Sequence, residues 1–229
     1  LRIECTRDDT VIKSMGWTEA DHASGGWAPV RGFVKSVDID ASVEAENMDW
    51  WFADMVQLEQ GPSFSFPASV KSVTGLFYGC MSLEGLPDGF SVPDAVGRIG
   101  NMFMGCSSLR TLPDGFAIPR GSADSPLLLG VLFMDCVSLE RLPESFVFPE
   151  GAMTEVVSGM FRGCSSLEEL PSGFRFPDVV KKADGTFYGC SSLRSLPEGF
   201  SLPSALTVSK SMYKGCSSLA SLPTGLDLP

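Results

Sequence analysis

Residues 103–119 read FMGCSSLRTLPDGFAIP, and this stretch recurs along most of the chain. Counted from its cysteine as position 0, an aromatic residue stands at −3, leucine at +3 and +6, proline at +7 and phenylalanine at +10. Six copies are centred on Cys80, Cys106, Cys136, Cys164, Cys190 and Cys216. Their spacings of 26, 30, 28, 26 and 26 residues are the period of a repeat protein.

An incomplete seventh copy precedes these six. Asp54 stands at the cysteine position in this alignment, and Trp51, Phe64, Phe66 and Pro67 then fall at −3, +10, +12 and +13. The alignment predicts one further coil before Cys80.

A single copy carries about seven apolar positions, too few to enclose a core, so the copies must stack and bury a continuous column. The sequence therefore predicts a repeat solenoid, a right-handed superhelix that is mostly β. We expect S-L-x-x-L to form a short parallel strand, and the residues before each cysteine to form a short helical or 3₁₀ turn. The Pro-Asp-Gly stretches at 87–89 and 113–115 are typical of tight turns.

Two regions follow from the repeat: an N-terminal cap at 1–47 and a solenoid of about seven coils at 48–229. The cap region contains an alternating stretch, Phe33 to Asp40, which suggests a strand with Lys35 pointing outward. Trp50 and Trp51 are expected to pack where the cap meets the first coil. The chain stops at Pro229, the last position of a repeat, so further repeats or a tail are expected beyond it.

The motifs LxxLPxGF and FxGCSSL resemble the BspA-like leucine-rich repeats of bacterial surface proteins and lipoproteins, over roughly residues 50–229. The stretch LPDGF is longer than the commonest form of that family between the leucine pair and the following Ile/Val-Pro. The resemblance implies a leucine-rich-repeat solenoid, an extracellular or cell-surface location, and a role in adhesion or in binding host or matrix molecules.

The cysteine row is expected to hold buried free thiols that behave as small hydrophobic groups. Cysteine metal sites need ligands that converge in pairs, and each cysteine here stands a full coil from the next. Side chains that project in parallel are poorly set for the dihedral angle of a disulfide of about 90°. Disulfides between adjacent coils and a metal site are the alternatives to free thiols.

Nothing in the repeats predicts catalysis. A serine stands at +2 in all six copies, but the single histidine of the chain, His22, lies outside them in a polar, glycine-rich stretch, so the serines have no predicted base. We expect them to hydrogen-bond a turn. The acidic residues at +8 are expected to serve turn chemistry rather than to bind Ca²⁺, and no cofactor or metal is expected. The stretch LPTG at 222–225 lacks the pattern of a sortase anchor.

The informative positions are those between the paired leucines, which vary from copy to copy and should be exposed. Solenoids use such rows for binding. The candidate binding residues are Arg110, Glu140, Arg141, Glu168, Glu169 and Arg194, with the inserted stretch RGSADSP (120–126) at one edge of this surface.

The partner is expected to be a protein or a glycan. The chain has 17 Lys and Arg against 28 Asp and Glu, a net charge of −11, and no segment of it forms a basic footprint for nucleic acid or an anionic membrane. Its longest apolar stretch, 127–133, is far shorter than the roughly 18 residues of a membrane span. We therefore expect a surface binding or adhesion module, with an inert spacer as the alternative and a polysaccharide-acting enzyme as the third reading.

Overall fold

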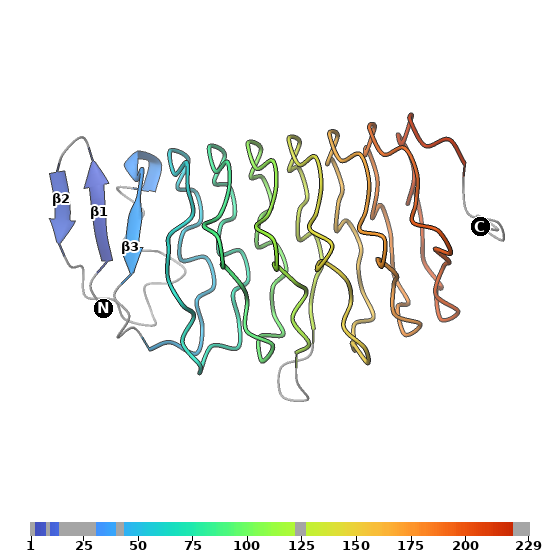
Figure 1. Ribbon diagram of the computed structural model, residues 1–229, viewed down its shortest axis with the longest axis horizontal. Coiled ribbons are helices and arrows are strands. Elements are labelled where there is room, and N and C mark those ends of the chain that lie inside the picture. The colour runs from blue at the N-terminus through green and yellow to red at the C-terminus, as the bar shows by residue number, and fades with distance from the viewer. Residues whose placement is uncertain (1–2, 8–9, 14–30, 40–43, 122–126, 222–229) are drawn as a thin grey trace.

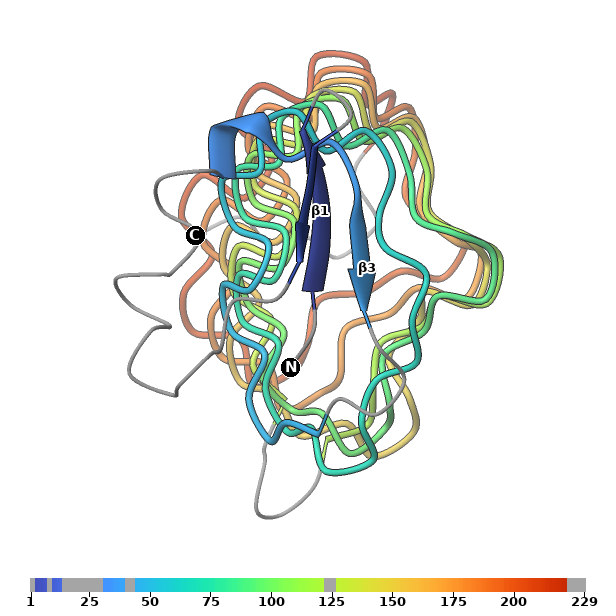
Figure 2. The same cartoon turned by 90° about the vertical axis from the view of Figure 1, so that its left-hand side faces the viewer.

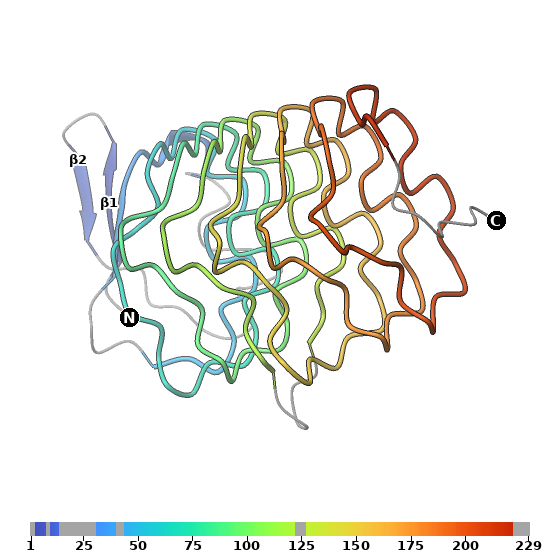
Figure 3. The same cartoon turned by 45° about the vertical axis from the view of Figure 1, so that its right-hand side comes forward.

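The computed structural model describes residues 3–7, 10–13, 31–39, 44–121 and 127–221, and it consists of a small sheet followed by a row of coils (Figure 1). The view from the end and the oblique view show successive coils following nearly the same outline and stacking along one axis (Figures 2 and 3). The chain therefore has a repeat fold. The predictions made for His22, for residues 122–126, for LPTG and for Pro229 lie outside the described residues.

The N-terminal region forms an antiparallel sheet with strand order β2-β1-β3. Its elements are β1 (Ile3–Arg7), β2 (Thr10–Lys13), the 3₁₀ helix η2 (Arg31–Phe33) and β3 (Val37–Ile39). The strand predicted over Phe33 to Asp40 is present only as β3, because Phe33 ends a 3₁₀ turn and is 45% exposed. Val34 and Val37 are instead the buried residues of this stretch, and Lys35 is exposed as predicted.

The coils are joined by an alternating pattern of backbone hydrogen bonds before each cysteine. Phe103 donates to the carbonyl of Leu132 in the next coil (3.0 Å), whereas Met104 donates to Asn101 within its own coil (3.1 Å). Cys106 then donates to Phe103, three residues earlier (3.0 Å). Since every second amide reaches the neighbouring coil, the turns here do not merge into a continuous 3₁₀ helix.

The predicted parallel strands are wrong for the described coils. Only isolated parallel bridges occur, mostly at position −8, as between Ser72 and Arg98 and between Lys182 and Val208. The S-L-x-x-L stretch bonds to the preceding coil at +2 in most coils, as the Ser166 amide donates to the Val137 carbonyl (3.2 Å), and at +4, where the Glu140 amide donates to the Arg110 carbonyl (3.0 Å). The turn at Cys106 to Leu109 (3.1 Å) interrupts the extended backbone just before this bond, so no strand ladder develops.

The alternation requires left-handed backbone at two positions in each coil, −5 and −1. Glycine holds position −1 in most coils, as at Gly105 (φ 78°), and Asp135 takes the same conformation at φ 62°. Val131, at −5, has φ 51°, which is unusual for a β-branched residue. The glycine in F-x-G-C is therefore explained by backbone conformation.

The alignment of the first coil with Asp54 at position 0 is wrong by one residue. The Met55 amide donates to Phe52 (3.3 Å), as each cysteine amide donates to its aromatic residue at −3, and Asp54 has the left-handed conformation of position −1 (φ 59°). Met55 therefore replaces the cysteine. Trp51 is buried, and the ring of Trp50 lies over Gly75 of the next coil.

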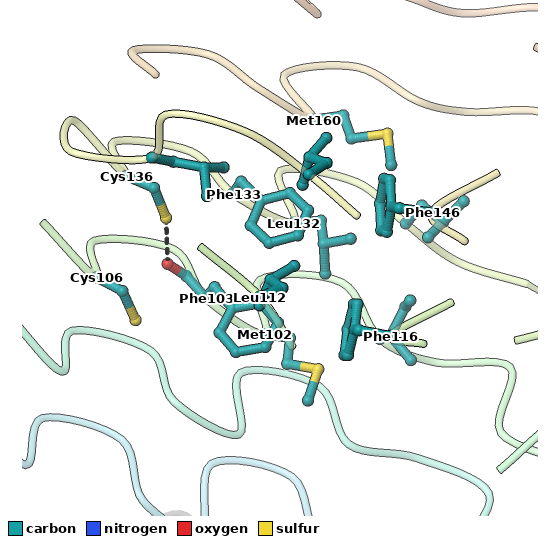
Figure 4. Packing of buried hydrophobic residues seen from close by; sticks show 14 of the residues in the cluster. Met102, Phe103, Cys106, Leu112, Phe116, Leu132, Phe133, Cys136, Phe146 and Met160 are labelled. Carbon is teal, nitrogen blue, oxygen red and sulfur yellow. Dashed lines mark hydrogen bonds between the residues drawn. The ribbon is translucent and has the colours of Figure 1, made fainter. Parts of the chain in front are cut away.

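Two columns of phenylalanine rings fill the interior (Figure 4). At position −3, Phe103 and Phe133 stack with centroids 5.4 Å apart, and at +10 Phe116 and Phe146 stack at 6.1 Å. The columns meet edge to face, as at Phe103 and Phe116 (5.9 Å). The predicted burial of the phenylalanine row at −3 and the leucine row at +3 is confirmed. The side chains that are 0% exposed include Phe103, Phe133, Phe161, Phe187, Leu109, Leu139, Leu167 and Leu193.

The cysteines form a third column, and all six in the repeats are free. Each thiol donates to the carbonyl of the aromatic residue at −3 in the preceding coil, as Cys136 Sγ does to Phe103 O at 2.9 Å (Figure 4). Burial raises the pKa of the Cys80 thiol to about 12, so the groups stay protonated. The prediction of buried free thiols is confirmed for five of the six, whereas Cys216 in the last described coil is half-buried. The structure adds a hydrogen bond from coil to coil.

Candidate binding groove

The six candidate binding residues are all exposed, but the four at position +4 pair with one another. Arg110 Nη1 lies 3.9 Å from Glu140 Oε1, and Arg194 Nη2 lies 3.0 Å from Glu168 Oε1. These pairs join adjacent coils along one row. Exposed ion pairs of this kind contribute about 0–1 kcal/mol to stability, so the row is a weak link between coils and its charges are partly neutralised.

The other two candidates, Arg141 and Glu169, stand at +5 and line a groove of about 310 Å³. The groove crosses three successive coils at positions +5 to +8. Its lining residues are Thr111, Leu112, Asp114, Arg141, Leu142, Pro143, Glu144, Glu169, Leu170 and Pro171. The structure thus separates the six predicted residues into a self-paired row and a pair that faces a groove.

The shape of the groove follows from the repeat. Leucine at +6 is almost fully buried, with exposures of 5%, 6% and 7% at Leu112, Leu142 and Leu170, so each presents only an edge to the surface. The proline at +7 then begins a tight turn, as the Phe146 amide donates to Pro143 (2.8 Å), and the +8 side chain is exposed. Leucine and proline therefore form an apolar floor, and the polar side chains at +5 and +8 stand beside it.

The groove is acidic with one cation. Asp114, Glu144 and Glu169 oppose Arg141, which gives a formal charge of −2. Glu144 is held in place, because its Oε2 accepts hydrogen bonds from the Ser172 amide (3.0 Å) and hydroxyl (2.7 Å). The lining therefore presents a net negative charge beside an apolar floor.

The acidity extends beyond the groove along positions +4, +5 and +8. We call this surface the acidic face; its exposed charged residues are Glu59, Glu84, Asp88, Arg110, Asp114, Glu140, Arg141, Glu144, Glu168, Glu169, Arg194 and Glu198. Nine carboxylates against three arginines give it a formal charge of −6.

Within the described part of the chain, no group of three or more His, Cys, Asp or Glu side chains is placed to hold a metal ion. The same residues contain no helix long and apolar enough to cross a membrane.

Sequence reasoning missed the part of the groove formed by positions +6 to +8. Asp114 and Glu144 were assigned to turn chemistry, and the leucines at +6 to the core. The recurrence of acidic residues at +8 was the available signal. This recurrence did not reveal the groove, because the depth of the groove depends on how far the turn at +8 projects beyond the leucine and proline floor.

No protein-family model matches the chain, and the comparison with curated proteins gives no relative. Among solved structures, it is similar to a leucine-rich repeat protein from Eubacterium ventriosum ATCC 27560, with a TM-score of 0.29 and 13% identity over 97% of this chain and 94% of that one. It is also similar to a leucine rich cell surface protein from Faecalibacterium prausnitzii A2-165, with a TM-score of 0.30 and 17% identity over 75% and 67%. At these scores the similarity carries no argument about a ligand.

Proposed function

We propose that this chain is a non-enzymatic binding module whose ligand lies in the groove at Arg141 and Glu169. The observation that supports it is the position of the groove. It crosses three coils at positions +5 and +8, where exposed side chains are free to vary, above +6 and +7 residues that the repeat keeps constant. A surface that runs from coil to coil is how solenoids gather enough area for a specific partner.

The groove favours a segment of a larger protein or glycan over an enclosed small molecule. Its volume of about 310 Å³ is at the lower end of small-molecule pockets, and its walls are polar, whereas such pockets are mostly apolar. A polymer that follows the stacking axis would cross the apolar floor and meet a charged side chain in each coil. The proposed location is extracellular or at a cell surface, and this rests on the resemblance of LxxLPxGF and FxGCSSL to surface repeats.

The test is binding of the purified chain to arrays of glycans, matrix proteins and extended peptides. The double variant Arg141→Ala/Glu169→Ala should weaken binding of any ligand found by at least ~10-fold, as expected for contacts at the centre of an interface. The matched control is Glu84→Ala, an exposed acidic position that does not line the groove. Equal losses in both variants would contradict the proposed site, and the absence of any ligand would favour the spacer.

A further inference from the structure

A cluster of cations lies on a different stretch of the coil perimeter from the acidic face. Arg162 and Lys214 stand at position −2, Lys210 at −6 and Lys182 at −8, in the last three described coils, and all four are exposed. We call these four residues the basic cluster. They come from segments up to 52 residues apart, so the charge pattern of the sequence did not reveal them.

The cluster is ordered around Tyr188. Arg162 Cζ lies 4.7 Å and Lys214 Nζ 5.8 Å from the centroid of its ring, so two cations from flanking coils share one aromatic side chain. These contacts hold the charges in place and reduce the entropy lost when a partner binds.

The charges of the basic cluster are not neutralised within the protein. Among the described residues, no carboxylate lies within 4.0 Å of the cationic groups of Arg162, Lys182, Lys210 or Lys214. The neighbouring Lys181, by contrast, pairs with Glu155 at 2.5 Å and is not counted. Asp184 is the nearest acidic neighbour in sequence, and its Oδ1 accepts a hydrogen bond from the Lys210 amide (3.0 Å).

The acidic face and the basic cluster are built on the same stack of coils. Adjacent coils lie about 5 Å apart, so charges at one position of successive coils on the acidic face have about that spacing. Arg162 and Lys214 share position −2 two coils apart, so their backbones are separated by about twice that distance along the stack. A second copy of this chain therefore offers charges of the opposite sign whose spacing comes from the same coil distance.

We propose that the basic cluster of one copy contacts the acidic face of a second copy. The two contacting surfaces are different, so the interface is heterologous, and each copy keeps one face available for a further copy. Association therefore continues into rings or chains.

The net charge of −11 sets how this association depends on salt. At low ionic strength the long-range repulsion between two acidic copies opposes contact. Near 0.15 M salt, where the Debye length is about 8 Å, distant charges are screened while contacting pairs still attract. At 1 M salt the pairs are screened as well. Association should therefore be strongest at intermediate salt.

The experiment is sedimentation velocity of the chain at several concentrations and salt levels, with two charge-neutralising variants. The first, Lys182→Ala/Lys210→Ala/Lys214→Ala, removes three of the four charges of the basic cluster, and the second, Asp114→Ala/Glu144→Ala/Glu169→Ala, removes part of the charge of the acidic face. The wild type should form species larger than dimers. Each variant alone should associate at least ~10-fold more weakly, and the mixture should stop at a 1:1 complex, since each variant retains one functional face.

Thermal melts establish that both variants are folded before they are compared. A wild type that stays monomeric at every concentration and salt level would overturn the proposal, as would variants that still associate like the wild type. Heparin, a sulfated polysaccharide, is the competing probe. A monomeric wild type that binds heparin through Lys182, Lys210 and Lys214 would show that the basic cluster serves an anionic polymer instead.

Discussion

The inner position −3 and the outer position +4 repeat with the same period and differ in almost everything else. At −3, Phe103 and Phe133 stack ring on ring at 5.4 Å and are fully buried. At +4, Arg110 and Glu140 face each other at 3.9 Å and are exposed. The inner row is aromatic in every coil, whereas the outer row reads Glu, Arg, Glu, Glu, Arg, Ala from Glu84 onward.

The comparison shows that contact with the next coil does not by itself restrict which residue types a position accepts. Both rows contact the next coil, but a buried ring contributes several kcal/mol through packing, and an exposed ion pair contributes about 0–1 kcal/mol. Burial therefore fixes the inner row, and the outer row is free to vary. The predictions below test this difference, beginning with the largest expected effect.

Raising the pH above 9 should destabilise the solenoid through the inner thiols alone. Burial raises the pKa of Cys80 from 9.0 to about 12 and raises those of Cys106, Cys136 and Cys164 as well. The unfolded chain then loses these protons first, so the stability that is fully present below pH 9 is lost as the pH rises toward 12. While the folded chain keeps a thiol protonated that the unfolded chain has lost, that thiol lowers the free energy of unfolding by about 1.4 kcal/mol per pH unit.

Urea unfolding between pH 7 and 10.5 measures this loss. The variant Cys106→Ala/Cys136→Ala should show a shallower fall of unfolding free energy with pH, since two of the titrating groups are gone. A slope unchanged by the double variant would show that other groups cause the loss.

Phe161→Ala should lower the free energy of unfolding by about 3–5 kcal/mol, because it opens a cavity in the ring column. Its neighbours Phe133 and Phe187 stack on it at 5.8 and 5.6 Å and cannot close the gap without moving whole coils. Glu168→Ala, at +4 of the same coil, should change stability by less than ~1 kcal/mol. Denaturant melts of both variants compare the rows directly, and similar losses would contradict the distinction.

A glycine at position 135 should stabilise the protein by up to ~1 kcal/mol. Asp135 has left-handed backbone at φ 62°, a conformation that glycine adopts without steric cost. Its side chain is exposed, so little packing is lost in Asp135→Gly. The reverse change, Gly105→Ala, places a Cβ at φ 78° and should destabilise by about 1–2 kcal/mol. Thermal melts that show the same sign for both variants would contradict this account of position −1.

The smallest expected change in stability is at Tyr213, the last ring of the inner column. Tyr213 stacks on Phe187 at 5.6 Å, and its hydroxyl is buried without a hydrogen-bond partner among the described residues. Burial also raises the pKa of this phenol. Tyr213→Phe removes the unpaired group and should raise the free energy of unfolding by about 1 kcal/mol. A loss of stability of that size would show that the hydroxyl has a partner.

The sequence by itself determined the repeat, its period and the buried rows, and it favoured free thiols over disulfides. These follow from a physical necessity, since copies with few apolar residues must stack and identical positions then form columns. The same reasoning identified Arg141 and Glu169 as exposed, because positions between constant leucines have no role in packing.

Only the tertiary structure decided how the backbone joins one coil to the next. Predicted strands became isolated bridges, because alternate amides bond within the coil and left-handed residues at −5 and −1 redirect the chain. Position 0 of the first coil moved from Asp54 to Met55 for the same reason: backbone conformation, and not residue type, sets the register.

The tertiary structure alone also decided which charges meet. Arg110 and Arg194 pair along their row, Arg141 and Glu169 face the groove, and Lys182, Lys210 and Lys214 come together from two coils. A linear sequence gives the position of each charge within its coil, but not the direction of a long side chain or its neighbours in adjacent coils. Those depend on the stacking distance and on how far each turn stands out from the core.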